Sequence, residues 1–155
     1  MKGNEKIIEK INDLLADELT AINQYIVHSE MCNNWGYEIL HKMDEKRAID
    51  EMKHAEKLIA RILFLEGRPI VSHLKKINIG AEVELQHKND RASEQDAIKS
   101  YNEGIKLATK LEDNGTRELF ESILKDEENH IDLLEAQLDQ IKQMGIQNYL
   151  TEQID

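Results

Sequence analysis

The sequence holds two matching sets of acidic and imidazole side chains whose types and spacing suit metal chemistry. The sets lie 76 positions apart and agree residue for residue: Glu18, Glu51 and His54, then Glu94, Glu127 and His130. In each set the two Glu residues are 33 positions apart, and the second Glu precedes the His by three. Residues at i and i+3 share one face of a helix, so each Glu-x-x-His pair could hold one ion from one side.

The repeat extends beyond these six positions. Residues 18–25 and 94–101 both read Glu-x-x-Ala-Ile-x-x-Tyr, and Asp50 matches Asp126 at the same offset. Such internal agreement indicates two similar halves, each with one Glu on its first helix and Glu-x-x-His on its second.

A single Glu-x-x-His pair is a weak signal in so acidic a chain. Two further pairs, Glu38/His41 and Glu84/His87, match the spacing but have no counterpart in the other half. We interpret them as ordinary helix polarity. The alternative for the six repeated residues is a set of polar side chains without a ligand, but a core seldom buries four carboxylates without a cation.

The six side chains form a hard ligand set of four carboxylates and two imidazoles, without thiolate. This set disfavours structural zinc, which usually takes cysteine and histidine, and favours iron or manganese. Four ionised Glu side chains would balance two divalent ions. The sequence therefore predicts a two-metal site in the interior of the protein.

The elements that must position these residues are helices, because one Pro and seven Gly leave long uninterrupted stretches of good helix formers. Apolar residues at steps of three and four predict four long helices, which span 5–34, 37–66, 81–112 and 116–144. Ile146, Leu150 and Ile154 predict a short tail helix. Residues 67–80 show no period and suit a crossover along the bundle. We predict an all-α, antiparallel four-helix bundle with a long crossover between the second and third helices, in one domain spanning 1–155.

Net charge and cysteine content bear on the possible partners and the cellular compartment. A formal net charge of −11 disfavours nucleic acid as a partner, since phosphates require a basic face, and suits a protein that collects cations. Cys32 is the only cysteine, which fits a reducing compartment. We see no secretory signal and no apolar run long enough to cross a membrane, so we expect a cytoplasmic protein.

One Glu from each of two helices and Glu-x-x-His from each of the other two is the ligand pattern of di-iron four-helix bundles. The chain also resembles the bacterioferritin family along essentially its full length. The segments that carry the resemblance are residues 1–3, 18–25, 49–55, 61–67, 124–132 and 144–150. The resemblance implies a ferritin-like fold, a ferroxidase centre of two irons per subunit that uses dioxygen or peroxide, and a ferric mineral stored inside a hollow shell of 24 subunits built from two-fold dimers.

The resemblance also gives roles to the residues. Glu51 and Glu127 would bridge the two irons, Glu18 with His54 and Glu94 with His130 would complete the two iron sites, and Tyr25 would lie beside the centre. An electron-donor ferredoxin could serve iron release. Some members carry a His at position 46 that assists iron at the inner surface; this chain has Lys46, which puts that accessory site in doubt although Asp50 is present.

Met52 departs from the repeat, because its counterpart is Glu128. It lies about 100° around the helix from Glu51, and with Ile49, Ile59 and Leu63 it forms a second apolar face. From the pattern alone this is a self-association surface, with Met as interface packing. The resemblance implies that Met52 ligates a haem b shared between two subunits.

Other readings stay open from the sequence. A non-haem ferritin, or another di-iron oxidase or peroxidase, would use the same six ligands; a rubrerythrin-like peroxidase is disfavoured because the chain has no Cys-x-x-Cys. DNA-protecting mini-ferritins place their irons between subunits and often have basic tails, which do not fit this chain. From a different class, the chain could be a structural helical oligomer without metal.

Overall fold

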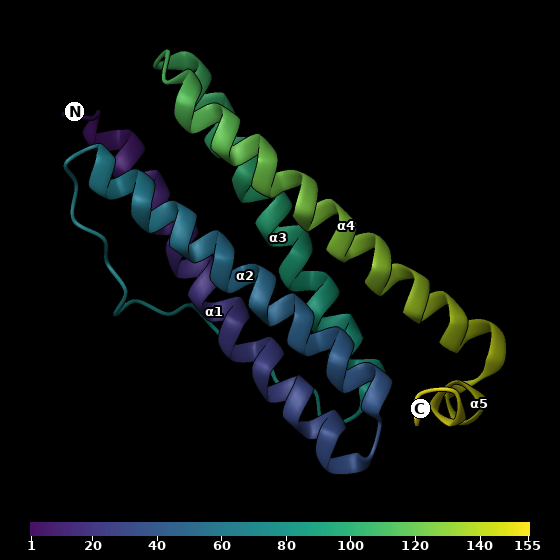
Figure 1. The fold of residues 1–155 in the computed structure, drawn as a ribbon. Helices are drawn as coiled ribbons and strands as arrows, with labels where there is room; N and C mark the ends of the chain where they lie inside the picture. The colour runs from purple at the N-terminus through teal and green to yellow at the C-terminus, as the bar shows by residue number, and fades with distance from the viewer.

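The computed structural model describes all residues, 1–155, and contains five helices and no strand. The helices are α1 (Glu5–Trp35), α2 (Glu38–Phe64), α3 (Val83–Lys110), α4 (Asn114–Met144) and α5 (Ile146–Thr151). Figure 1 shows two long helical hairpins, α1–α2 and α3–α4, that pack side by side, with α5 turned across one end of the bundle. The prediction of a four-helix bundle with a short fifth helix is confirmed.

The ends of the four long helices differ from the predicted ones by at most two residues. The second helix ends at Phe64 rather than at position 66, because Glu66 has a left-handed backbone with φ of 60°. The fourth helix begins at Asn114, earlier than predicted, because the Asp113 side chain accepts a hydrogen bond from the Thr116 amide at 3.0 Å. Asp113 is thus an N-cap.

The crossover runs along α1 without secondary structure of its own (Figure 1). Polar side chains on one face of α1 accept hydrogen bonds from backbone amides of the crossover. The donors and acceptors are Ile70 N to Asn12 at 2.9 Å, Lys75 N to Thr20 at 2.8 Å, Asn78 N to Gln24 at 3.0 Å and Gly80 N to His28 at 2.9 Å. These contacts satisfy amide groups that a strand or helix would otherwise pair.

Two apolar clusters fill the ends of the bundle. The larger cluster has twelve buried residues, among them Ile11, Leu58 and Phe120, and the smaller contains Cys32, Leu40, Val83, Ile141 and Tyr149. Buried acidic and imidazole side chains belong to neither cluster, although they come from all four long helices. The apolar clusters therefore hold the helices at fixed separation around a polar middle layer.

The tail helix packs on its own chain. Tyr149 is fully buried, and its hydroxyl lies 3.0 Å from His87 Nε2 and donates to Gln137 Oε1 at 2.5 Å. His87, interpreted from the sequence as ordinary helix polarity, is thus a buried anchor for α5. Of the three predicted apolar tail residues, Ile146 and Leu150 pack against the smaller cluster, whereas Ile154 is exposed. No helix combines the length and apolar character needed to span a membrane.

Candidate metal centre

Each long helix contributes to one buried cluster of carboxylates and imidazoles. Glu18 comes from α1, Glu51 and His54 from α2, Glu94 from α3, and Glu127 and His130 from α4; none is more than 6% exposed. Their potential ligand atoms form two groups, Glu18–Glu51–His54–Glu127 and Glu51–Glu94–Glu127–His130, and within each group the atoms lie within 4.8 Å of one another. Glu51 and Glu127 belong to both groups, as expected for side chains between two ions.

The two histidines present the same ring nitrogen to the cluster. Nδ1 of His54 lies 3.1 Å from a Glu127 oxygen and 3.7 Å from oxygens of Glu18 and Glu51. Nδ1 of His130 lies 3.0 Å from Glu51 and 3.4 Å from Glu94. Both rings therefore have Nδ1 as the atom available for a metal.

The other ring nitrogen of each histidine is held by an aspartate from the opposite hairpin. His54 Nε2 lies 2.9 Å from Asp126 Oδ2, and His130 Nε2 lies 3.1 Å from Asp50 Oδ2. A carboxylate that accepts Nε2–H fixes the tautomer with a free Nδ1 lone pair and makes that nitrogen a better ligand. Sequence reasoning aligned these aspartates but did not give them this role.

The cluster lacks the hydrogen bonds that would satisfy it without a cation. Seven of the twelve buried side-chain nitrogen and oxygen atoms without a hydrogen-bond partner belong to these six residues. Glu127 has both carboxylate oxygens in this state, and each histidine has its Nδ1. Buried polar atoms are nearly always paired, so seven converging unpaired ligand atoms fit a site built for metal ions.

Charge repulsion perturbs the acids of the cluster. Burial, followed by the charges of Glu18 and Glu127, raises the pKa of Glu51 well above its ordinary value, and burial with Glu18 and Glu94 does the same for Glu127. Burial opposes the charged form of His54, but the Glu127 and Glu18 carboxylates outweigh it and raise the His54 pKa to about 11. The metal-free cluster therefore holds protons that arriving cations must displace.

Two tyrosines brace the terminal carboxylates from across the bundle. The Tyr25 hydroxyl donates to Glu94 Oε1 at 2.8 Å, and the Tyr101 hydroxyl donates to Glu18 Oε1 at 2.5 Å. Burial and the adjacent carboxylate raise both phenol pKa values, so both remain donors. Tyr25 was expected beside the centre; Tyr101 was not singled out, although it is the repeat counterpart of Tyr25.

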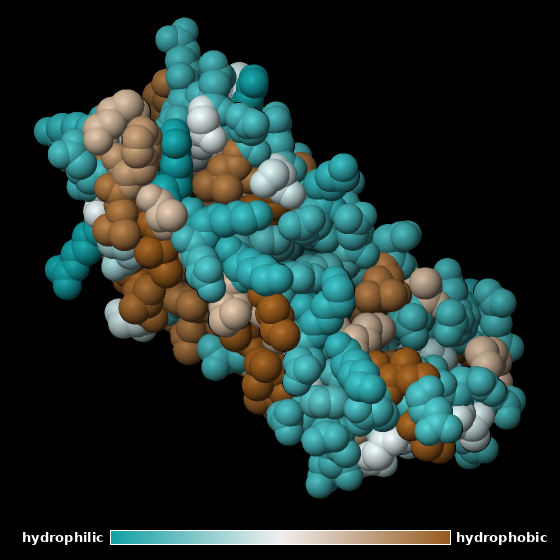
Figure 2. Space-filling view, viewed as in Figure 1, coloured by the Kyte–Doolittle hydropathy of each residue, from teal (hydrophilic) through white to brown (hydrophobic).

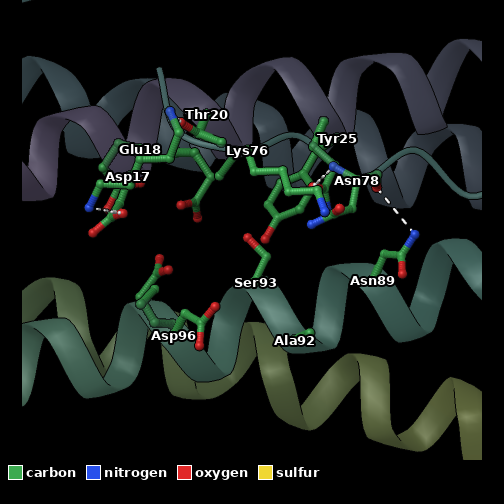
Figure 3. Close-up of a pocket in the computed structure, with 16 residues that line it drawn as sticks. Asp17, Glu18, Thr20, Tyr25, Lys76, Asn78, Asn89, Ala92, Ser93 and Asp96 are labelled. Carbon is green, nitrogen blue, oxygen red and sulfur yellow. Dashed lines mark hydrogen bonds and ion pairs between the residues drawn. The ribbon is translucent and has the colours of Figure 1, made fainter. Parts of the chain in front are cut away.

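A cavity of about 340 Å³ lies between α1, α3 and the crossover and reaches Glu18, Glu51 and Glu127. Figure 3 shows Asp17 and Glu18 on α1 across this space from Ser93 and Asp96 on α3, with the Lys76 side chain of the crossover extending toward Tyr25. Carboxylates thus line a path to the cluster. Lys75 neutralises part of its rim, because its Nζ lies 2.6 Å from Asp17 Oδ1.

Met52 and Lys46 lie outside the cluster. Met52 is 46% exposed on α2, on the same side of the helix as the exposed Ile49 and Leu63. Figure 2 shows a hydrophobic band over the α1–α2 side of the molecule. Lys46 Nζ lies 3.3 Å from Asp50 Oδ2, so Lys46 pairs with the aspartate that the expected accessory iron site would have needed.

Comparison with known proteins agrees with this geometry. Bacterioferritin of Brucella melitensis is 44% identical over 149 residues, covering 96% of this chain and 92% of the relative. Bacterioferritin of Rhodobacter capsulatus is 41% identical with the same coverage, and that of Streptomyces coelicolor is 40% identical over 155 residues, covering 100% of this chain and 93% of the relative. A model of the ferritin-like domain matches residues 8–144.

The chain belongs to the bacterioferritin family. Bacterioferritins store iron, and this chain is accordingly an iron-storage protein with buried carboxylate and histidine groups compatible with a di-iron site. The four Glu and two His of that site come from the same repeat that the sequence displays, so family membership and the internal symmetry point to the same interior location.

Proposed function

We propose that the chain oxidises ferrous iron at the buried cluster, with Glu18, Glu51, His54, Glu94, Glu127 and His130 as ligands. The seven unpaired ligand atoms that converge in the core carry this proposal. Two ferrous ions together supply two electrons, the number that reduces one dioxygen to hydrogen peroxide or one hydrogen peroxide to water. A site that holds two ions side by side therefore matches either oxidant.

The protein groups prepare the ligands for this chemistry. Asp50 and Asp126 hold Nδ1 of the histidines toward the ions, and the tyrosine hydroxyls orient the terminal carboxylates. Glu51 and Glu127 would shed protons as cations enter, because burial and neighbouring carboxylates raise their pKa values and a bound cation favours the ionised form. The carboxylate-lined cavity gives ferrous ions a route from the surface.

The test is an anaerobic ferrous titration of the metal-free protein, followed by admission of oxygen. We expect a break near two irons per chain, then oxidation faster than in buffer with a soluble ferric product. Glu127→Gln keeps the side-chain shape but removes a ligand of both groups, and should lower the oxidation rate at least about tenfold. Glu121→Gln is the matched control, since Glu121 is an exposed residue of α4 paired with Arg117. An unaltered rate in Glu127→Gln would overturn the assignment.

We further propose that the exposed apolar face of α2 forms a two-fold contact between subunits, where Met52 would hold a haem b shared by the two subunits. The support is the Met52 thioether, which is 46% exposed on the same side of α2 as the exposed Ile49 and Leu63. Met52→Leu should abolish the haem absorption bands of reconstituted protein, while Met144→Leu, an exposed methionine elsewhere, should retain them. Equal haem binding by both variants would exclude the role.

The larger assembly follows as a proposal from the family. We expect 24 subunits enclosing ferric mineral, a reduced ferredoxin as electron donor for iron release, and a cytoplasmic location consistent with the single buried Cys32. Light scattering of the purified protein measures the first of these directly; a particle no larger than a dimer would exclude storage inside a shell.

A further inference from the structure

One buried side chain breaks the symmetry between the two halves of the metal centre. Arg47 on α2 is 1% exposed, and the residue at the matching position of α4 is Ile123, which is 0% exposed. The groups around Arg47 differ in the same way. His28, Asp44 and Asp90 are buried in one half, and their counterparts are Gly104, Phe120 and Leu14 in the other. One half of the centre therefore adjoins a charged network, and the other adjoins an apolar core.

The guanidinium of Arg47 contacts a proposed metal ligand directly. Its Nη2 lies 3.3 Å from Glu94 Oε1, and its Cζ lies 4.0 Å above the centre of the Tyr25 ring. Glu94 Oε1 thus receives Arg47 and the Tyr25 hydroxyl together. Glu18, the counterpart of Glu94, has the Tyr101 hydroxyl and the His54 ring where Glu94 has Tyr25 and the His130 ring, but it has no arginine.

The two aspartates that pair with Arg47 contact its Nη1 atom, not the Nη2 atom that faces Glu94. Asp90 Oδ2 lies 3.0 Å and Asp44 Oδ1 3.3 Å from Nη1. Asp90 also accepts from Gln24 at 2.8 Å and lies 2.9 Å from His28 Nδ1. Because Gly80 N–H donates to His28 Nε2, His28 Nδ1 carries a proton and donates to Asp90. Asp44 and Asp90 therefore hold the guanidinium through Nη1 while Nη2 contacts Glu94.

A fixed positive charge next to one carboxylate has a definite effect on divalent ions. Glu94 must share its charge between Arg47 and any bound ion, whereas Glu18 has no such competitor. The guanidinium would also repel an ion held by Glu94, in a buried region where charges are poorly screened. Asp90, 3.0 Å from Nη1, offsets only part of this charge because it lies on the side away from Nη2 and Glu94.

We propose that Arg47 makes the two metal positions unequal: the first divalent ion binds to Glu18 and His54, and the second binds more weakly to Glu94 and His130. We expect the two dissociation constants to differ by about tenfold or more, equivalent to about 1.4 kcal/mol. The inference rests on the proposed function only in requiring that the cluster bind metal.

Co(II) titration of the metal-free assembled protein tests the inference without turnover. Calorimetry and visible absorption should resolve two sequential events per chain in the wild type. The double variant Arg47→Met/Asp90→Asn removes one charge of each sign and should bring the two constants within about threefold of each other. Arg61→Met is the control, because Arg61 is on the same helix as Arg47 but pairs with Asp113 instead of a cluster residue. This variant should keep the two-step titration.

A crystal with one cobalt equivalent per chain provides a second readout that does not depend on any variant. Anomalous scattering should place the ion on Glu18 and His54. Equal constants in the wild type, an unchanged ratio in the double variant, or first occupancy of Glu94 and His130 would each overturn the inference. Absence of cobalt binding altogether would instead overturn the proposed function on which it rests.

Discussion

Removing one bridging carboxylate should stabilise the metal-free protein, contrary to the usual effect of changing a buried residue. In Glu51→Gln the amide keeps the shape of the side chain but carries no charge. Glu51 is fully buried, and both groups of ligand atoms contain it together with two other carboxylates. Its raised pKa, caused by burial and by Glu18 and Glu127, reflects the same crowding.

The magnitude follows from the separations within the cluster. An ionised Glu51 would be repelled by one carboxylate within 4.8 Å by about 3 kcal/mol at an effective dielectric constant of about 20. Taking up a proton instead costs free energy at neutral pH, because the same carboxyl is ionised in the unfolded chain. Glu51→Gln avoids both costs. The histidines return part of that energy, because Glu51 lies 3.0 Å from His130 Nδ1 and 3.7 Å from His54 Nδ1. A net gain of about 1–3 kcal/mol remains, which corresponds to a rise in Tm of roughly 3–10 °C for a chain of this size.

Differential scanning calorimetry of the metal-free assembled protein measures this shift. Glu38→Gln is the control, because Glu38 pairs with Lys42 at an exposed position of the same helix and should change stability by less than about 0.5 kcal/mol. Divalent metal should raise the Tm of the wild type markedly and that of Glu51→Gln much less. A metal-free Glu51→Gln protein no more stable than the wild type would refute the argument from repulsion.

Three further outcomes follow from single contacts. Burial lowers the His87 pKa from 6.5 to about 4, so the unfolded chain binds a proton at a higher pH than the folded chain does, and the wild type should lose up to about 3 kcal/mol of its free energy of unfolding as pH falls from 6.5 to 4. His87→Gln should not show this loss when both proteins are unfolded with urea across that range. Parallel plots of unfolding free energy against pH for the two proteins would contradict the prediction. Gly104→Ala should lower Tm, because a Cβ there would lie 2.9 Å from a carbon of the Phe120 ring, a cost of about 1–3 kcal/mol; an unchanged Tm would mean that the ring moves freely. Asp126→Asn should weaken Co(II) binding by about 10–100-fold, as calorimetry would show, and unaltered affinity would remove Asp126 from its role behind His54.

The sequence predicted the helices and the convergence of six side chains in one cluster because both depend on spacing along the chain. A repeat at 76 positions singles out six residues from a large acidic background, and helical periodicity places them on inward faces. Arg47 could not be found in this way. In a helix that also contains Lys42, Lys46 and Lys53, an arginine is indistinguishable by pattern from a solvated side chain. Arg47 is buried because the fold places side chains of α1 and α3 around it, namely Tyr25, Asp90 and Glu94.

The exchange of partners between hairpins was also hidden in the sequence, and it changes how the site must be understood. Each histidine is held by an aspartate of the other hairpin, and each tyrosine donates to a glutamate of the other hairpin. The internal repeat lists matching residues but does not say that they pair crosswise, because that depends on how two similar units dock. A hairpin by itself would hold two Glu and one His, with the His unanchored and its glutamate unbraced. The competent centre therefore forms only when the hairpins dock, and metal that binds it stabilises the docking as well as the ligands.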